Sequence, residues 1–141
     1  ALNWCFNEPW PTAANNSIVN WPAWPKPAFY AVKNACRPVL ASARNSRFSW
    51  SRGEVFSAQL WLLNDLYQAL QNGVMKATLI SGRKQLELGS WEFAGADPST
   101  NLEGPTMKAE LPSWKPGLFT LLLEVEGHPE YNSEYTFLLA D

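Results

Sequence analysis

Hydrophobic residues fall at every second position over much of the chain after residue 38. In residues 54–63, for example, Phe56, Ala58, Leu60 and Leu62 share one face of an extended backbone. A period of two is typical of a β-strand that has one buried face. The same alternation predicts strands over residues 54–63, 74–80, 106–111, 118–126 and 134–139.

Two further segments are predicted to be strands with an irregularity in each. Residues 39–50 read as a strand that breaks near Asn45, and residues 84–93 change phase before Trp91, which indicates a bulge near Gly89. Turns rich in glycine, asparagine and proline separate these segments. About seven short antiparallel strands in roughly 100 residues predict an all-β fold, an immunoglobulin-like β-sandwich.

The strand register also predicts the core. Leu60 and Leu62 of one strand and Leu121 and Leu123 of another are expected to face inward. Between two of the strands, residues 64–73 could form a two-turn helix that begins at an aspartate and ends at a glycine.

The first 38 residues have a different composition from the rest. They hold six of the 11 Pro and four of the 8 Trp, and so many prolines preclude a long helix or a paired central strand. One short helix fits at Pro27–Cys36, because Pro27 suits a first helical position and Pro38 prevents continuation. We therefore expect two parts, residues 1–38 and residues 39–141.

The overall composition excludes several classes of protein. With 46% hydrophobic and 17% charged residues, the chain is not disordered. A net charge of −2 without clusters of Lys and Arg does not indicate a nucleic-acid partner. No apolar run approaches the roughly 20 residues of a membrane span, and no signal peptide is visible at the start of the sequence.

The chain has few residues for metal binding or nucleophilic catalysis. Cys5 and Cys36 are expected to be two buried free thiols, with a disulfide between them as the alternative. A structural zinc site needs about four Cys or His ligands, and the chain has three such residues in all. His128 lies in a turn, so no Ser-His-Asp or Cys-His arrangement is convincing. We expect no metal and no cofactor.

One polar and aromatic segment has the chemistry of a sugar site, residues 4–11. In it Asn7 and Glu8 stand beside tryptophans, and an aromatic face can stack on a sugar ring. Glycoside hydrolysis needs two carboxylates about 5–5.5 Å or about 6.5–9.5 Å apart. The next acidic residue after Glu8 is Glu54, so a complete catalytic site is not expected. The alternative is a loop packed by its own aromatic residues.

Two other groups of aromatic residues have alternative readings. Residues 21–30 could be a sugar platform or a polyproline-type surface, but a connection whose aromatics cover a neighbouring domain is favoured. Four tryptophans of the predicted sandwich could form an exposed carbohydrate-binding row, but core or sheet-face positions are favoured: Trp50, Trp61, Trp91 and Trp114.

Residues 3–38 resemble the end of the catalytic barrel in glycoside hydrolase family 2, especially its β-mannosidase-like members. These enzymes close the barrel with a motif like Trp-Gln-Leu-Asn-Asp-x-Trp-Pro, which corresponds here to residues 4–11, Trp-Cys-Phe-Asn-Glu-Pro-Trp-Pro. The segments Ser17–Trp21 and Trp24–Lys33 resemble the stretch that follows in the family. The match covers about a quarter of the chain, and residues 39–141 resemble the family's C-terminal immunoglobulin-like sandwich by strand count and position.

The resemblance implies a non-catalytic C-terminal region of a retaining, exo-acting glycoside hydrolase that cleaves terminal β-linked sugars such as β-mannosides or β-galactosides. Both catalytic carboxylates would lie upstream, so the chain alone would be inactive. Trp4 would align with the tryptophan that walls the sugar subsite, with Asn7, Glu8 and Trp10 nearby as substrate-binding residues. Glu8 replaces the more usual aspartate, which leaves the sugar specificity open.

The partners implied are the catalytic barrel of the parent enzyme and, in the parent, a carbohydrate, with no cofactor. An exported parent, periplasmic or extracellular, would fit. Residues 1–10 would lack a partner in their own chain, so self-association through them is expected. The alternative function is an independent carbohydrate-binding or adhesion module of immunoglobulin-like fold.

Overall fold

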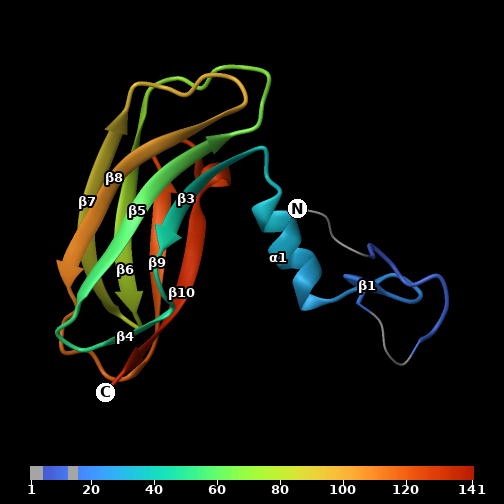
Figure 1. Cartoon of the computed structure of the whole chain (residues 1–141), viewed down its shortest axis with the longest axis horizontal. Helices are drawn as coiled ribbons and strands as arrows, with labels where there is room; N and C mark the ends of the chain where they lie inside the picture. The colour runs from blue at the N-terminus through green and yellow to red at the C-terminus, as the bar shows by residue number, and fades with distance from the viewer. Residues whose placement is uncertain (1–4, 13–15) are drawn as a thin grey trace. The chain divides into compact units, whose positions relative to one another are not determined.

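The computed structural model describes residues 5–12 and 16–141, and Trp4 therefore lies outside the described residues. The chain forms two compact units, Ala1–Arg37 and Pro38–Asp141 (Figure 1). The first unit contains β1 (Val19–Asn20), β2 (Trp24–Pro25) and α1 (Pro27–Ala35). The second contains β3 (Val39–Asn45), β4 (Ser49–Ser51), β5 (Val55–Asn64), β6 (Gly73–Ser81), β7 (Lys84–Phe93), β8 (Thr100–Glu110), β9 (Gly117–Val125), the 3₁₀-helix η1 (Pro129–Tyr131) and β10 (Ser133–Ala140).

The first unit consists of a short hairpin followed by the expected helix. β1 and β2 pair antiparallel, with Val19 opposite Pro25. Pro27 begins α1, where its missing N–H costs nothing because the first helical N–H groups have no partner inside the helix. None of the helix side chains is buried within the chain. Among the described residues, no helix is long and apolar enough to cross a membrane.

The second unit is a sandwich of two sheets, which confirms the expected all-β fold (Figure 1). One sheet has the order β3-β5-β8 and the other β4-β10-β9-β6-β7. All neighbouring strands in these sheets are antiparallel except β4, which pairs parallel with β10. Taken in chain order, the first, second and fifth long strands share one sheet, and the third, fourth, sixth and seventh share the other.

The core lies between the two sheets and follows the alternation in the sequence. Leu60 and Leu62 of β5 and Leu121 and Leu123 of β9 have no exposed surface, which confirms the expected register. Lys108 of β8 points to solvent, while Met107 beside it is buried. The period of two therefore assigns the two faces of the strands correctly.

Both predicted irregularities occur. β3 ends at Asn45 in one sheet, and the chain then crosses to the other sheet, where Ser49–Ser51 form β4 beside β10. Between β6 and β7, Ala77 pairs with Gly89 and Thr78 with Glu87, so one extra residue is accommodated in β7. Gly89 has φ +134°, a conformation that side-chain-bearing residues rarely adopt.

The helix suggested for residues 64–73 is wrong. Asn64 is fully buried, and its side-chain amide donates hydrogen bonds to the carbonyl oxygens of Gln68 and Asp97 (both 2.9 Å). Its Oδ1 accepts the N–H of Leu66 (3.1 Å). The Gln68 carbonyl is a group that a helix over these residues would have paired internally, and the segment is a loop between β5 and β6 instead.

Leu121→Ala should lower the free energy of unfolding by about 2–5 kcal/mol, because it leaves a cavity in a fully buried position. The matched control is Leu118→Ala in the same strand, where the side chain is 68% exposed and the change should stay within about 0.5 kcal/mol. Urea denaturation followed by circular dichroism measures both. Equal losses would mean that the register of β9 is not the one described.

Candidate functional site

The carboxylate of Glu8 lies at the centre of the first unit. Its Oε1 accepts a hydrogen bond from the Ser17 hydroxyl (3.2 Å) and forms an ion pair with Lys26 Nζ (3.3 Å). Its Oε2 accepts the backbone N–H of Trp21 (3.2 Å). Both oxygens are therefore occupied, and Glu8 is only 6% exposed.

The same contacts control the ionisation of Glu8. Burial raises the pKa of the Glu8 carboxyl, but the hydrogen bonds from Trp21 N–H, Lys26 and Ser17 and the Lys26 charge outweigh it, so the pKa is below its ordinary value. Glu8 is thus held as a carboxylate by its surroundings. A general acid needs the opposite shift, a pKa raised toward the working pH.

The backbone around Glu8 is fixed by the hairpin. The N–H of Glu8 donates to Val19 O (3.1 Å), and the N–H of Val19 donates to Phe6 O (2.9 Å). Ile18 donates to the carbonyls of Cys5 and Phe6 (both 3.2 Å). The expectation that residues 1–10 have no partner in their own chain is therefore wrong for residues 5–8, because β1 supplies one.

The remaining predicted site residues are on the surface. Asn7 is exposed, beside its bridge partner Val19, and Trp10 is 63% exposed. The structure thus brings Asn7 and Glu8 together on one segment but turns them in opposite directions, Asn7 outward and Glu8 inward. Trp4, the fourth predicted residue, lies outside the described residues.

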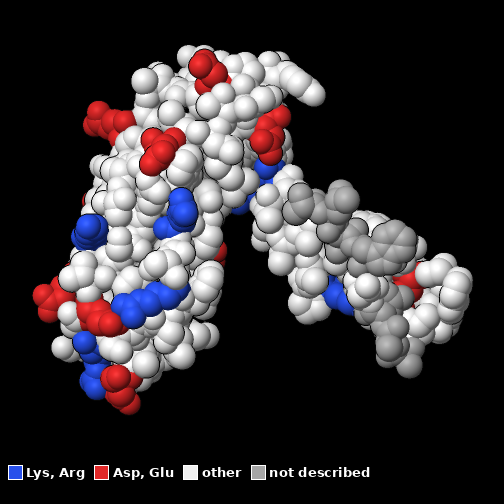
Figure 2. Space-filling view, viewed as in Figure 1, with Lys and Arg blue, Asp and Glu red and all other residues white. Residues whose placement is uncertain are grey.

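Large aromatic side chains dominate the surface of the first unit. Five of them are about half exposed or more: Phe6, Trp10, Trp21, Trp24 and Tyr30. Most of the described surface of this unit in Figure 2 is neither acidic nor basic. Residues 21–30 were expected to cover a neighbouring domain with their aromatic side chains, and three of these side chains are exposed: Trp21, Trp24 and Tyr30.

The cysteines are free thiols, as expected, but they are not both buried. Cys36 is exposed because it caps the C-terminal end of α1, and Cys5 is half-buried. Within the described residues no cluster of His, Cys, Asp or Glu could hold a metal ion.

The tryptophans of the sandwich do not form an exposed row. Trp50 and Trp114 are each 4% exposed and belong to the core, so the carbohydrate-binding row is wrong. Trp61 is half-buried, and Trp91 covers Gly104, where an added Cβ would lie 2.6 Å from the indole ring. The favoured prediction, that these tryptophans occupy core or sheet-face positions, is confirmed.

Ser17 and Lys26, the partners of Glu8, were not among the site residues predicted from the sequence. Glu8 is the first acidic residue of the chain, and the next is 46 positions further on, at Glu54. A lone acid in a proline-rich, apolar segment is a signal for a paired internal charge, because an unpaired buried carboxylate is costly. Its partner then has to be one of the few basic residues nearby, and Lys26 comes first among them.

Comparison with curated proteins relates the chain to glycoside hydrolases. It is 31% identical to a protein named Beta-mannosidase B from Aspergillus clavatus over 93 residues, which are 62% of this chain and 11% of that protein. A second Beta-mannosidase B, from Aspergillus flavus, is 41% identical over 51 residues, 36% of this chain and 6% of that protein. The aligned region thus spans about a tenth of these relatives, and no family model matches the chain.

Solved structures share the sandwich fold at low sequence identity. A β-glucosidase from Listeria innocua superposes with TM-score 0.51 and 10% identity over 73% of this chain and 16% of that chain. The CARDB domain of the PF1109 protein from Pyrococcus furiosus superposes with TM-score 0.54 and 6% identity over 72% of this chain and 85% of that chain. Identities this low concern the fold alone. The similarity to the two proteins named Beta-mannosidase B is what relates this chain to a region of a glycoside hydrolase.

The order around Glu8 should depend on pH. Its folded pKa is depressed, so its contribution to stability is present above the unfolded pKa and is lost as the pH falls through the lower, folded pKa. The backbone amide signal of Trp21, which donates to Glu8, should therefore move in an acid titration followed by ¹⁵N-¹H NMR.

The control is Glu8→Gln, which keeps the size of the side chain but cannot ionise. In this variant the acid transition of the Trp21 signal should disappear. An unchanged transition in Glu8→Gln would show that another group governs this region.

Proposed function

We propose that the chain forms the C-terminal, non-catalytic part of a retaining, exo-acting glycoside hydrolase of the family 2 type. Residues 1–38 supply the last strand, loop and helix of the catalytic barrel, and residues 39–141 are its immunoglobulin-like accessory domain. The parent cleaves terminal β-linked sugars, such as β-mannosides or β-galactosides.

The observation that carries the proposal is the similarity to β-mannosidases. The aligned region makes up about a tenth of those relatives, which is what a peripheral part of a large glycoside hydrolase would give. The match to the Listeria β-glucosidase concerns the sandwich fold alone. The barrel-closing motif of residues 4–11 supports the same assignment from the sequence.

The physical character of the first unit supports a partner domain. Its buried residues in the described part are few: Glu8, Ser17, Ile18 and Val19. Chains below about 40 residues normally need a disulfide, a metal or an assembly partner to fold. The two cysteines are free, and the described residues hold no metal cluster. A barrel that covers the exposed aromatic residues would provide the missing burial.

A non-catalytic role follows from the carboxylates. Glu8 is the sole acidic residue among residues 1–53, and both its oxygens are engaged by Ser17, Lys26 and Trp21. A retaining mechanism requires a second carboxylate about 5–5.5 Å away. We therefore assign Glu8 to hold the loop in place, with Asn7, Trp10 and Trp4 as the side chains that contact the sugar in the parent enzyme.

The isolated chain, residues 1–141, should not hydrolyse aryl β-mannosides or aryl β-galactosides. We expect hydrolysis by a chimera in which this chain replaces the matching region of Aspergillus clavatus β-mannosidase B. The same chimera with residues 38–141 alone should be inactive, because it lacks the barrel-closing segment. Release of p-nitrophenol measures all three proteins, and circular dichroism confirms that each is folded.

Within the active chimera, Asn7→Ala should lower kcat/KM by about tenfold, as expected for the loss of one hydrogen bond to a sugar hydroxyl. Asn20→Ala is the matched control, because Asn20 is also exposed and belongs to the same unit. A folded but inactive chimera would contradict the proposal. Turnover by the isolated chain that Glu8→Gln abolishes would contradict it as well.

A further inference from the structure

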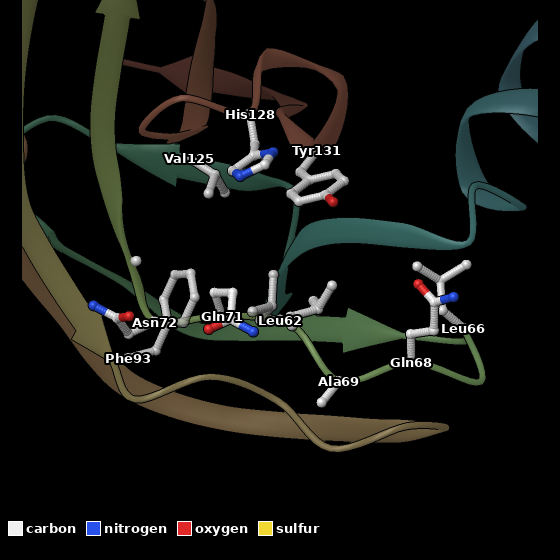
Figure 3. Close-up of a pocket in the computed structure, with 12 residues that line it drawn as sticks. Leu62, Leu66, Gln68, Ala69, Gln71, Asn72, Phe93, Val125, His128 and Tyr131 are labelled. Atoms are coloured by element: carbon white, nitrogen blue, oxygen red, sulfur yellow. The ribbon is translucent and has the colours of Figure 1, made fainter.

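A cavity of about 250 Å³ opens at one end of the sandwich and is lined wholly by residues of the second unit. Figure 3 shows His128 and Tyr131 on one wall and Gln71, Leu62 and Phe93 on the wall opposite. The first wall comes from the turn after β9 and from η1, and the second from β5, β7 and the loop before β6.

The walls of this cavity are held by the fold. Asn64 anchors the loop through its bonds to Gln68 and Leu66, and Leu70 exchanges two backbone hydrogen bonds with Ala96 (2.8 and 3.2 Å). On the strand side, Phe93 packs directly against the bare Cα of Gly73, where an added Cβ would come 2.7 Å from the ring. The cavity is therefore preformed, which lowers the entropic cost of binding.

The lining selects an uncharged ligand. It contains no Lys, Arg, Asp or Glu, so a charged ligand would lose its hydration without an opposite charge to replace it. Its floor is apolar, formed by Leu62, Phe93 and Val125.

The rim carries three side-chain amides, from Gln68, Gln71 and Asn72, and none of them is hydrogen-bonded within the described part of the chain. An amide both donates and accepts, as a hydroxyl group does.

The aromatic wall completes the site. The rings of His128 and Tyr131 are stacked, with centroids 4.7 Å apart and planes 7° from parallel. The carboxylate of Glu130 lies 3.0 Å from His128 Nδ1, which fixes the orientation of the imidazole and leaves Nε2 as the ring atom for a ligand. Flat aromatic surfaces beside amide groups match a ring that is apolar on its faces and hydroxylated at its edge.

We propose that this cavity binds a single neutral pyranose ring, either as a free sugar or as the terminal unit of an oligosaccharide. Its volume lies below the roughly 300–1,000 Å³ of pockets for larger ligands, so one ring is the size that it accommodates. The proposal does not rest on the proposed function, because the cavity belongs entirely to the sandwich. A sugar-binding accessory site and a barrel-closing segment can be tested separately.

The test is NMR titration of the full chain, residues 1–141, with methyl β-D-mannopyranoside, methyl β-D-glucopyranoside and mannotriose. The ring signals of His128 and Tyr131 should shift with at least one sugar, with a Kd in the millimolar range. Gln71→Leu should weaken binding by about tenfold, because it removes an amide partner of the hydroxyls at nearly constant volume. Gln85→Leu is the matched control, because Gln85 is exposed at the opposite end of β6 and β7. This variant should bind the sugars as tightly as the unsubstituted chain does.

Two further probes examine the ligand class. Glucuronate, which adds a carboxylate to the same ring, should bind at least about tenfold more weakly, because the cavity lining holds no Lys or Arg to pair with its charge. Cyclohexanol should also bind more weakly, because it keeps only one of the several hydroxyls that the amides would recognise on a pyranose ring.

Mannotriose that binds as tightly as the methyl glycosides indicates a free ring or chain end, and tighter binding by mannotriose indicates an oligosaccharide terminus. Both results support a pyranose site. The proposal is overturned if no sugar shifts the His128 and Tyr131 signals, if Gln71→Leu binds as the unsubstituted chain does, or if cyclohexanol or glucuronate binds as tightly as the neutral sugars.

Discussion

The sandwich depends on one cluster of aromatic side chains that joins its two sheets. Phe56 of β5 packs against Phe119 of β9 and Phe137 of β10 at centroid distances of 5.9 and 5.3 Å, in edge-to-face geometry. Trp50 of β4 adds a fourth ring, 5.1 Å from Phe56. Because β5 lies in one sheet and the other three strands lie in the second, this cluster sets the spacing of the layers. It also explains why the chain crosses between sheets after Asn45, since the crossing delivers Trp50 to the cluster.

The sequence predicted most of this sandwich because alternation is a local property that burial on one face imposes directly. The break at Asn45 and the bulge beside Gly89 were also readable, because each disturbs the phase of the alternation. The loop after β5 was not, because its conformation depends on the buried amide of Asn64 and on Asp97, 33 residues later. A helix prediction uses neighbouring residues only, so it cannot include a hydrogen bond to a residue 33 positions away. Trp50 and Trp114 did not share this difficulty, because core or sheet-face positions were favoured for them and both lie in the core.

The candidate site in the first unit was also predictable only in part. The residue types of the Asn7 and Glu8 segment indicated sugar chemistry, and the exposure of Asn7 and Trp10 is compatible with it. The role of Glu8 was not predictable from type, because a carboxylate that contacts a substrate and one that closes an internal network look alike in sequence. The distinction lies in Lys26, 18 residues away, which reaches Glu8 only because the hairpin of β1 and β2 brings the chain back.

A buried ion pair is a poor source of stability, since the desolvation of both charges offsets most of their attraction. Its value in the first unit is geometric. Glu8 connects the first segment to the hairpin through Ser17 and Trp21 and to the start of α1 through Lys26, the residue that precedes the helix. Three elements that bury little apolar surface are thereby held in one arrangement, and the apolar side chains that a larger core would have used stay outside. Because the core of this unit is so small, five aromatic side chains remain at the surface: Phe6, Trp10, Trp21, Trp24 and Tyr30. A unit built around a charge pair, with its aromatic residues turned outward, has little core of its own, which supports the proposal that it completes the surface of a catalytic barrel.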